Sequence, residues 1–374
     1  MAHAYTPGLK ISERTKIKKE RRLPLPGEVV VSLGDSVKAD TIVARTNLPG
    51  NVQTMNVAGL LGILPEDIRT CMLKKEGDPV KKGDAIAETK GLFGLFKSKA
   101  TAPEDGSIES VSHITGQVIF REPPIPVEVS AYIDGEVVEV FEKEGVAVET
   151  MCALVQGIFG IGGEAFGELK RAVGSPEMVL TPGEIDKDCR GKVLIGGSLI
   201  TVEAVKKAVE LGAHGIVAGG IADQDLSQFL GYDIGVAITG SEEKGITLIV
   251  TEGFGRLKMA EKTFRLLSGH EGKKASINGT TQIRAGVIRP EVVVPLDSRK
   301  EAAVKRREYK EGLEVGSPVR VIREPHFGQL GKVVALPPEL RQIETGAKVR
   351  VLDVELEGGA TVTLPRANVE MLEE

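Results

Sequence analysis

The stretch MLKKEGDPVKKGDAIAE, residues 72–88, indicates the architecture of the first third of the chain. It places two Gly-Asp pairs, Gly77-Asp78 and Gly83-Asp84, between short apolar runs. Glycine adopts backbone angles that a Cβ atom forbids, and aspartate closes a tight turn through its carboxylate. The stretch therefore predicts short strands joined by tight turns.

The same pattern occurs on both sides of this stretch. EVVVSLGDSVKADTIVA (residues 28–44) has its own Gly-Asp turn at Gly34-Asp35, and AYIDGEVVEVFEKEGVAVET (residues 131–150) is a weaker third copy. REPPIPVEV (residues 121–129) is a proline-stiffened connector that suits a sheet edge or polyproline II. Residues 23–150 are therefore expected to be all-β.

The Gly-Asp stretch, taken with TAPEDGSIESV at residues 101–111, resembles the barrel-sandwich hybrid of biotinyl and lipoyl domains. In that family, EGDxVxxGDxLxE precedes a hairpin that is followed by APxxGxV. The residues that match are Glu76, Gly77, Asp78, Val80, Gly83, Asp84, Ile86, Glu88, Ala102, Pro103, Gly106 and Ile108. The resemblance implies this fold for residues 23–150.

The hairpin tip differs from that of a modified carrier domain. A modified lysine in that family is flanked by Asp and Ala or by two Met, whereas the tip here is TKGLFGLFKSKAT, residues 89–101. Lys90, Lys97 and Lys99 are therefore expected to be ordinary lysines, with no lipoyl or biotinyl group. The aromatic residues Phe93 and Phe96 have two interpretations: packing on a neighbouring domain, or contact with a partner or membrane surface.

The pattern changes near residue 151, and residues 151–296 alternate between apolar strands and helices. A glycine-rich turn leading into a helix is expected within residues 153–173. The strands expected after it are 192–197, 214–221, 234–240 and 245–255, and the helices are 201–212, 223–231 and 256–269. This alternation predicts a small parallel sheet covered by helices.

Glycines gather at the expected ends of these strands. Loops at the carboxyl ends of parallel strands line one crevice, where backbone amides favour anions. The candidate cofactor-binding residues are Gly160, Gly162, Gly163, Gly196, Gly197, Ser198, Gly219, Gly220, Gly253 and Gly255. They suit a nucleotide or flavin, but simple turn geometry is the favoured explanation, because the chain has neither a complete GxGxxG nor a P-loop.

QGIFGIGGEAF, residues 156–166, resembles the GxxGxGGAxFP run that opens the flavin- or NADH-binding domain in the C subunit of Rnf-type electron-transport complexes. The matching residues are Gly157, Gly160, Gly162, Gly163 and Phe166. Two positions depart from the run, since Glu164 precedes Ala165 and Gly167 replaces the proline. This resemblance implies a redox protein as one alternative.

The last part of the chain, residues 313–374, returns to short strands and tight turns. It resembles the KOW element of SH3-like barrels through Val319, Val321, Phe327, Gly328, Gly331 and Val333. Such modules contact RNA, ribosomes or transcription machinery, or serve as plain assembly modules. Arg320, Arg323, Lys332 and Arg341 are the candidate phosphate contacts. A basic linker, residues 297–312, precedes the module, and interleaved acidic residues argue against a strongly basic face.

Composition narrows the class of protein. The 374 residues carry a formal net charge of −5, with 4% aromatic residues and no tryptophan. The three cysteines, Cys71, Cys152 and Cys189, form no metal or disulfide pattern and suit a reducing cytoplasm. Neither a secretory signal nor a membrane span is apparent. The basic arm, residues 1–22, is expected to be extended and solvated, with contact to an acidic partner or nucleic acid as the alternative.

Three functional hypotheses remain open. Because the sequence shows no catalytic motif, the first is a non-enzymatic cytoplasmic assembly or adaptor protein that binds a protein partner or itself. The second is an RNA-, ribosome- or transcription-associated factor that acts through the C-terminal barrel. The third is a nucleotide- or flavin-binding redox protein.

Overall fold

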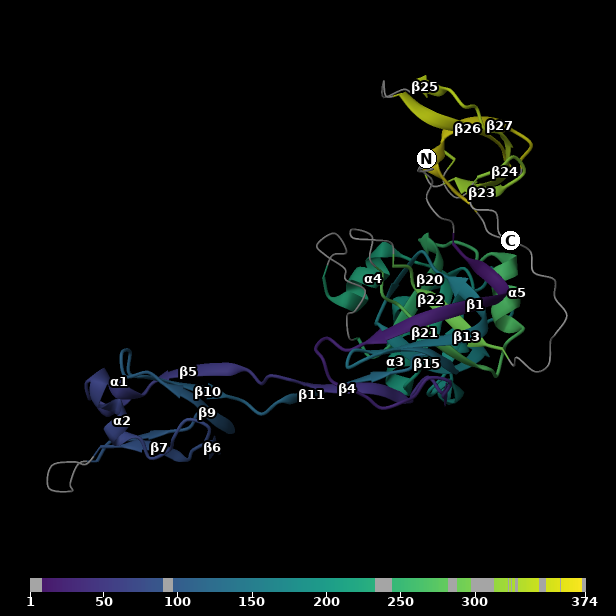
Figure 1. Cartoon of the computed structure of the whole chain (residues 1–374). Coiled ribbons are helices and arrows are strands. Elements are labelled where there is room, and N and C mark those ends of the chain that lie inside the picture. Colours follow the sequence, from purple (N-terminus) through teal and green to yellow (C-terminus); the bar gives the residue numbers. More distant parts are fainter. Residues whose placement is uncertain are drawn as a thin grey trace.

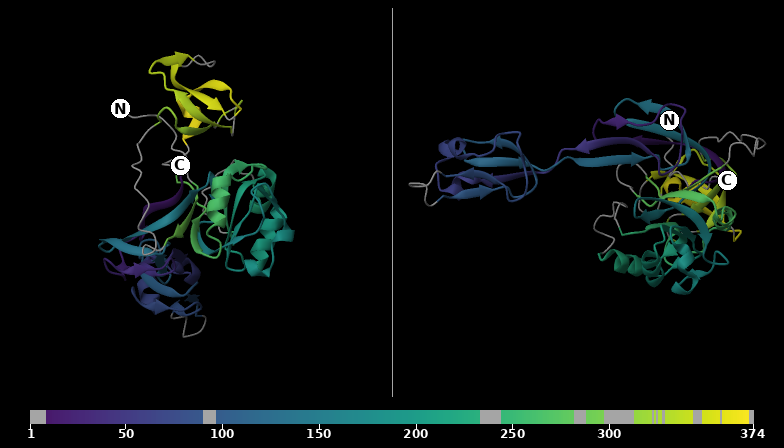
Figure 2. Two further views of the ribbon diagram at one scale, coloured as in Figure 1. Left: turned by 90° about the vertical axis from the view of Figure 1, so that its right-hand side faces the viewer. Right: turned by 90° about the horizontal axis from the view of Figure 1, so that it is seen from below.

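The computed structural model describes residues 9–89, 97–232, 244–281, 288–296 and 313–371, except residues 322, 324, 327–328, 343–347 and 357. The protein is a β-rich, multidomain molecule with several separate sheets. We name its parts the distal module (residues 50–122), the C-terminal module (residues 313–371) and, between them, the central body. The distal module projects from the central body on a narrow stalk, and the C-terminal module lies against another side (Figures 1 and 2).

The distal module has a core of its own. Its four-stranded sheet has the order β5 (Val52–Asn56), β10 (Gln117–Arg121), β9 (Gly106–Val111) and β6 (Pro79–Val80). A second ribbon pairs β7 (Ala85–Glu88) with β8 (Lys99–Thr101), and two short helices, α1 (Val57–Leu61) and α2 (Ile68–Cys71), cover one end. The fully buried side chains of Ile68, Ile86 and Ile108 lie in this core.

The two Gly-Asp turns that the sequence predicts are formed in the distal module. Gly77 and Gly83 have φ values of 90° and 87°, in the left-handed region that favours glycine. The carboxylates of Asp78 and Asp84 accept hydrogen bonds from the backbone N–H groups three residues earlier, at 2.7 and 3.0 Å. The turn chemistry is confirmed.

The stalk is an antiparallel pair, β4 (Ile42–Leu48) with β11 (Ile125–Ser130). At its outer end Leu48 lies opposite Ile125. At its inner end β4 also pairs with β2 (Glu28–Val29), and the chain enters a second core that includes Val43 and Ile133. Residues 23–150, expected as one β-rich region, therefore contain two separate cores joined by the stalk.

The N-terminal basic run is not a solvated arm. Its residues form β1 (Ile11–Arg22), which pairs along its length with β13 (Gly145–Gln156). Three of its basic side chains form ion pairs, Lys16 with Glu149, Lys18 with Glu139 and Arg22 with Glu144. The expectation of a solvated arm was wrong because acidic side chains of neighbouring strands neutralise the run.

Strand β13 is shared between the two parts of the central body. Besides β1, it pairs with β12 (Gly135–Phe141) and with β22 (Glu291–Pro295). A short strand, β3 (Ser36–Val37), extends this sheet beyond β12. The domain boundary expected at residue 150 lies inside β13, because the strand contributes to both cores.

The rest of the central body contains the parallel strands. These run in the order β15 (Glu164–Arg171), β17 (Val193–Ile195), β19 (Gly215–Ile221) and β20 (Thr247–Phe254). Antiparallel strands flank them, β14 (Phe159–Ile161) on β20 and β21 (Lys274–Asn278) on β15. The pair β16 (Val179–Leu180) and β18 (Leu199–Ile200) joins at one end. The helices are α3 (Val202–Leu211), α4 (Asp223–Leu230) and α5 (Glu261–Ser268).

Helix α3 forms where its capping signals predict it. The Thr201 side chain caps its first turn, and Gly212 ends it with φ at 78°. By contrast, the prediction of a helix within residues 153–173 is wrong. Residues 164–171 form β15, whose buried Gly167 lets the backbone pass close to Gly191. Helix α5 is shorter than expected, and the strand expected at 234–240 lies outside the described residues.

The C-terminal module is a small all-β unit. Its sheet contains β23 (Pro318–Val321), β24 (Leu330–Ala335), β25 (Leu340–Gln342), β26 (Lys348–Leu356), β27 (Thr361–Pro365) and β28 (Val369–Met371). Val319, Val321 and Val333 lie in its core, as the pattern of strands predicts. No described helix of the chain is both long and apolar enough to cross a membrane.

Candidate functional site

The candidate glycines fall into four segments of the chain, and three of these segments meet at the carboxyl edge of the parallel strands. Gly196–Ser198 follows β17, Gly219–Gly220 lies near the end of β19, and Gly253–Gly255 ends β20. The Gly219 N–H donates to the Gly197 carbonyl at 2.7 Å, and Gly220 lies opposite Gly253 in the sheet. The structure therefore brings these segments together, as expected for loops at one edge of a parallel sheet.

The fourth segment lies at the opposite edge. Gly162 packs against the Ile246 carbonyl, and Thr247 Oγ1 donates to the Gly162 carbonyl oxygen at 3.1 Å, where β20 begins. Gly160 is held by Thr281, whose hydroxyl accepts the Gly160 N–H at 2.8 Å. Gly163, with φ at 67°, forms the turn between β14 and β15. Gly160, Gly162 and Gly163 therefore do not join the other glycines in one crevice.

Backbone carbonyls already accept hydrogen bonds from four of the amides at this edge of the sheet. The N–H groups of Gly196, Ser198 and Gly255 donate to the carbonyls of Val217, Met178 and Ile221, each at 2.8 Å. An anion cradle requires N–H groups that point to the ligand. These four amides, including that of Gly219, instead hold neighbouring segments together.

Close packing of the chain explains why glycine is needed here. A Cβ atom on Gly219 would lie 2.1 Å from the Leu257 carbonyl oxygen, and one on Gly220 would lie 2.1 Å from that of Gly255. Gly197 is equally tight against the Met178 carbonyl. Backbone approach therefore accounts for these glycines without a ligand.

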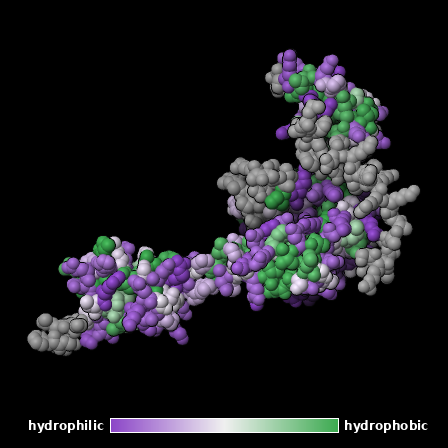
Figure 3. Space-filling view, viewed as in Figure 1, coloured by the Kyte–Doolittle hydropathy of each residue, from purple (hydrophilic) through white to green (hydrophobic). Residues whose placement is uncertain are grey.

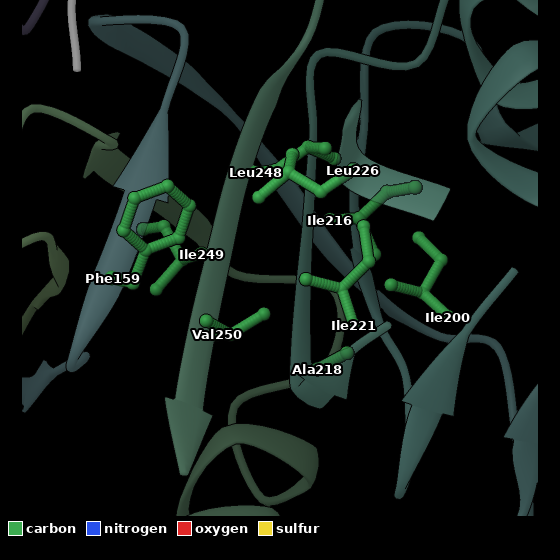
Figure 4. Close-up of a pocket in the computed structure, with 9 residues that line it drawn as sticks. All are labelled: Phe159, Ile200, Ile216, Ala218, Ile221, Leu226, Leu248, Ile249 and Val250. Atoms are coloured by element: carbon green, nitrogen blue, oxygen red, sulfur yellow. The ribbon is translucent and has the colours of Figure 1, made fainter. Parts of the chain in front are cut away.

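A cavity near this edge is apolar and small. Nine residues line it, mainly from β19 and β20, and Figure 4 shows their aliphatic and aromatic side chains around these strands. Its free volume is about 10 Å³, close to the minimum that one water molecule needs. The cavity is a packing void too small for a nucleotide.

The C-terminal module contacts the same edge through a largely buried ion pair. An Arg320 guanidinium nitrogen of β23 lies 2.6 Å from Glu252 Oε2 of β20, and each side chain is only 11% exposed. The other carboxylate oxygen accepts the Ala260 N–H at 3.0 Å, just before α5. Arg320, expected to meet phosphate, is therefore committed to a contact with the central body.

The remaining basic candidates of the C-terminal module lie among other charges. Lys332, Arg323 and Arg341 are exposed. On the sheet surface Lys332 lies directly opposite Glu355 of β26, which weakens any positive field there. The described part of this module thus offers scattered cations.

The hairpin candidates Phe93 and Phe96, like Lys90, lie outside the described residues.

A polar cluster that sequence reasoning missed fixes the root of the stalk. Directly after β11, the Tyr132 hydroxyl donates to Glu291 at 3.1 Å, and Lys19 pairs with the same carboxylate at 2.6 Å. Arg21 makes two 2.7 Å bonds to Glu164, and its Nε donates to the Ser130 carbonyl at 2.7 Å. The pairs join residues more than a hundred positions apart, so no local sequence signal marks them.

Tyr132 is constrained in both its backbone and its ionisation. It is one of two described non-glycine residues with positive φ, at 68°, a conformation that costs energy. Burial, followed by the nearby Glu291 carboxylate, raises the pKa of Tyr132 well above its usual 10.0. The phenol therefore stays neutral and serves as a fixed hydrogen-bond donor.

Burial keeps two of the cysteines in the thiol form. Burial raises the pKa of Cys152 to about 12 and also raises the pKa of Cys189. Lys97 and Lys99 both pair with Glu88 of β7, and these contacts lower the pKa of Glu88. Among the described residues, no cluster of three or more metal-ligating side chains occurs.

Comparison with protein-family models and curated proteins finds no match. No family model matches this chain, and no curated protein is significantly similar to it in sequence. The resemblances to carrier-type and KOW modules therefore rest on the residues quoted above.

Proposed function

We propose that this chain is a non-enzymatic assembly or adaptor protein of the cytoplasm that binds a macromolecular partner. One observation carries the proposal. The distal module has its own core, and only the two strands β4 and β11 continue from it into the central body. A folded module held away from the body on a stalk presents most of its surface for contact.

In this proposal the distal module is a carrier-type barrel-sandwich relative without a prosthetic group. The two Gly-Asp turns support the assignment, and the pairing of Lys97 and Lys99 with Glu88 supports an unmodified hairpin. The C-terminal module is a KOW-like barrel that acts in assembly, supported by its docking on the central body through Arg320. The free thiols of Cys71, Cys152 and Cys189 suit a reducing compartment.

The two other functions have less support. RNA or transcription-complex binding through the C-terminal module retains Arg323 and Lys332 as exposed cations, whereas Arg320 is held by Glu252. It predicts binding that weakens steeply with salt and disappears when residues 299–374 are deleted. A nucleotide- or flavin-binding redox function has less support because four amides of the glycine edge, those of Gly196, Ser198, Gly219 and Gly255, already donate to backbone carbonyls.

Excision of the distal module tests the proposal. Because Leu48 lies directly opposite Ile125, an Asn-Gly turn can replace residues 49–124 and close β4 and β11 into a hairpin. Tagged full-length and excised proteins are then purified from the source cells and their bound proteins quantified. We expect a partner present in near-equal amount with the full chain to be lost from the excised protein.

Two further measurements complete the test. Circular dichroism and thermal unfolding must show that the excised protein keeps its folded central body. An absorbance spectrum of the full chain reports any bound flavin or nucleotide. Retention of every partner by the excised protein, or a stoichiometric chromophore in the full chain, would refute the adaptor function.

A further inference from the structure

Strand β5 forms one border of the distal module. It pairs with β10 on one side, and no described strand pairs with its other edge. Figure 1 shows β5 along the side of the module opposite β6 and β7, and Figure 3 shows no other described part of the chain lying beyond this border. The outer edge of β5 is therefore accessible to a further strand.

The register shows which backbone groups this edge presents. The Glu122 N–H donates to the Asn51 carbonyl at 2.9 Å, in the same register as the pairing of β10 with β5. Hydrogen-bonded and non-hydrogen-bonded pairs alternate along an antiparallel ladder. The N–H groups of Val52, Thr54 and Asn56 therefore point away from β10, as do the C=O groups of Val52 and Thr54. The side chains of Val52 and Thr54 are exposed.

Strand β5 lacks the residues that protect the other edges. Among the described strands, every other edge strand longer than three residues contains a charged residue or a proline. They are β1 with Lys16 and Lys18, β7 with Glu88, β11 with Pro126 and β27 with Pro365. Such residues hinder pairing with a further strand. Strand β5 instead belongs to an uncharged run from residue 46 to residue 65. This contrast indicates that β5 is an interaction edge.

Nearby charges do not select a charged partner for this edge. On β10, Arg121 donates to Glu109 at 2.7 Å, and Glu122 beyond it accepts from the side chains of Asn51 and Gln53, each at 2.9 Å. Three exposed charges follow the uncharged run, in η1 (Pro65–Asp67) and α2 and outside the sheet: Glu66, Asp67 and Arg69. The charges on the neighbouring strand are thus paired, and β5 itself has none.

The sequence of β5 suits pairing with a second copy of itself. An antiparallel pair centred on Thr54 sets Thr54 opposite Thr54 and Val52 opposite Asn56. It directs outward N–H groups at outward C=O groups, Thr54 to Thr54 and Asn56 to Val52. Threonines that face each other across strands stabilise a sheet, whereas like charges destabilise it. The same arrangement of β1 about Lys18 would oppose two lysines.

We propose that two copies of this chain pair through β5 as antiparallel strands, so that their distal modules share one continuous sheet. The inference goes beyond the proposed adaptor function, because a chain can bind a foreign protein with or without this pairing. The paired segment has five residues and buries far less than the ~1,000 Å² of a stable interface. The dimer is therefore reversible, and its two stalks leave from opposite ends of the shared sheet.

Cysteine cross-linking tests the register. In the full-length chain, Cys71→Ser first removes the one cysteine that is not buried. Thr54→Cys then places a thiol opposite its own copy, at about 5.5 Å between Cα atoms and within reach of a disulfide. Val52→Cys is the matched control, since its own copy lies about 14 Å away along the paired strands. We expect Thr54→Cys to form a disulfide-linked dimer under mild oxidation and Val52→Cys to remain monomeric on a non-reducing gel.

Charge substitutions test the same axis without oxidation. Sedimentation velocity over a range of concentrations measures the dimer of the full-length chain. Thr54→Lys or Thr54→Glu alone sets like charges opposite each other and should weaken the dimer severalfold, up to about tenfold. An equal mixture of the two variants sets Lys against Glu and should restore the dimer. Gln117→Lys is the control, because Gln117 is exposed on β10, one strand away from the edge.

Three results would overturn the pairing. The first is a full-length chain that stays monomeric at every concentration, with Thr54→Cys oxidising no faster than Val52→Cys. The second is a dimer that Thr54→Lys and Thr54→Glu leave unchanged, because another surface would then hold it. The third is protection of β5 in hydrogen exchange only when a foreign protein is bound, which would assign the edge to that protein. These experiments use the purified chain alone, so the adaptor function stands or fails separately by module excision.

Discussion

The distal module and the C-terminal module are held to the same central body by different means. The distal module continues from β4 and β11, whose backbone pairing runs from the second core of the body to Leu48 and Ile125. The C-terminal module contacts the body through the buried pair of Arg320 and Glu252. Backbone pairing tolerates most side-chain changes, whereas a buried ion pair depends on each partner. The comparison predicts that single substitutions will release one module and not the other.

The largest expected effect tests whether the distal module is an independent unit. Ile108→Ala removes a fully buried side chain from its core, and such truncations cost about 2–5 kcal/mol of unfolding free energy. Hydrogen exchange followed by mass spectrometry should show lost protection in β5, β9 and β10. Protection in β19 should not change, because the two cores are separate.

Ile216→Ala is the matched control, since Ile216 is almost fully buried in the core around β19. It should reverse the pattern, with protection lost in the body and kept in the distal module. If either substitution lowers protection in both regions to the same extent, the two cores unfold as one and the stalk transmits stability.

The second effect concerns the C-terminal module. Glu252→Gln leaves the largely buried Arg320 charge without its partner, and because the pair is not fully buried its loss costs up to about 3 kcal/mol. We expect the module to separate from the body, so that small-angle scattering reports a larger radius of gyration and protease cleaves more readily between body and module. Distal-module protection should remain unchanged.

Two variants control this experiment. Arg323→Gln removes an exposed charge of the same module and should change nothing. The exchange of charges in Arg320→Glu with Glu252→Arg should restore part of the compact form. A compact Glu252→Gln protein would show that other contacts hold the C-terminal module.

Local parts of this architecture could be predicted from sequence. The Gly-Asp turns, the capped helix α3 and the buried strands β17 and β19 each depend on residues within a few positions of one another. Propensity, capping and periodicity act over that range. The glycines of β17, β19 and β20 could likewise be expected to converge, because parallel strands align their carboxyl ends.

Features that depend on distant partners could not be predicted. The basic run at residues 11–22 suggests solvent exposure until β13 and its acidic neighbours are placed beside it. Residues 164–171 follow a glycine-rich turn, as a helix often does, but sheet pairing with β17 and β21 outweighs local preference. The role of Arg320 depends on Glu252, which is 68 positions away.

A smaller effect tests the root of the stalk. Tyr132→Phe keeps the ring but removes the hydroxyl that donates to Glu291, a loss of about 1 kcal/mol. Urea unfolding should detect it. Because the folded protein raises the pKa of Tyr132 above 10.0, only the unfolded state ionises readily there. That contribution to stability is complete below pH 10.0 and declines above it, so the variant should show a shallower alkaline loss. An equally steep decline in the variant would mean that other groups, such as Cys152, dominate.

The smallest expected effect comes from an ion pair on the stalk, which can be compared with the ion pair of the C-terminal module. Arg45 on the stalk pairs with Glu28, just as Arg320 pairs with Glu252, but the stalk side chains are 56% and 62% exposed. Water screens such a pair in both the folded and unfolded states, so its removal changes little. Arg45→Ala should therefore leave both the unfolding midpoint and the radius of gyration unchanged. A measurable change in the radius alone would show that the Arg45 pair helps to set the direction of the stalk, because β4 and β11 would remain paired while their angle to the body changed.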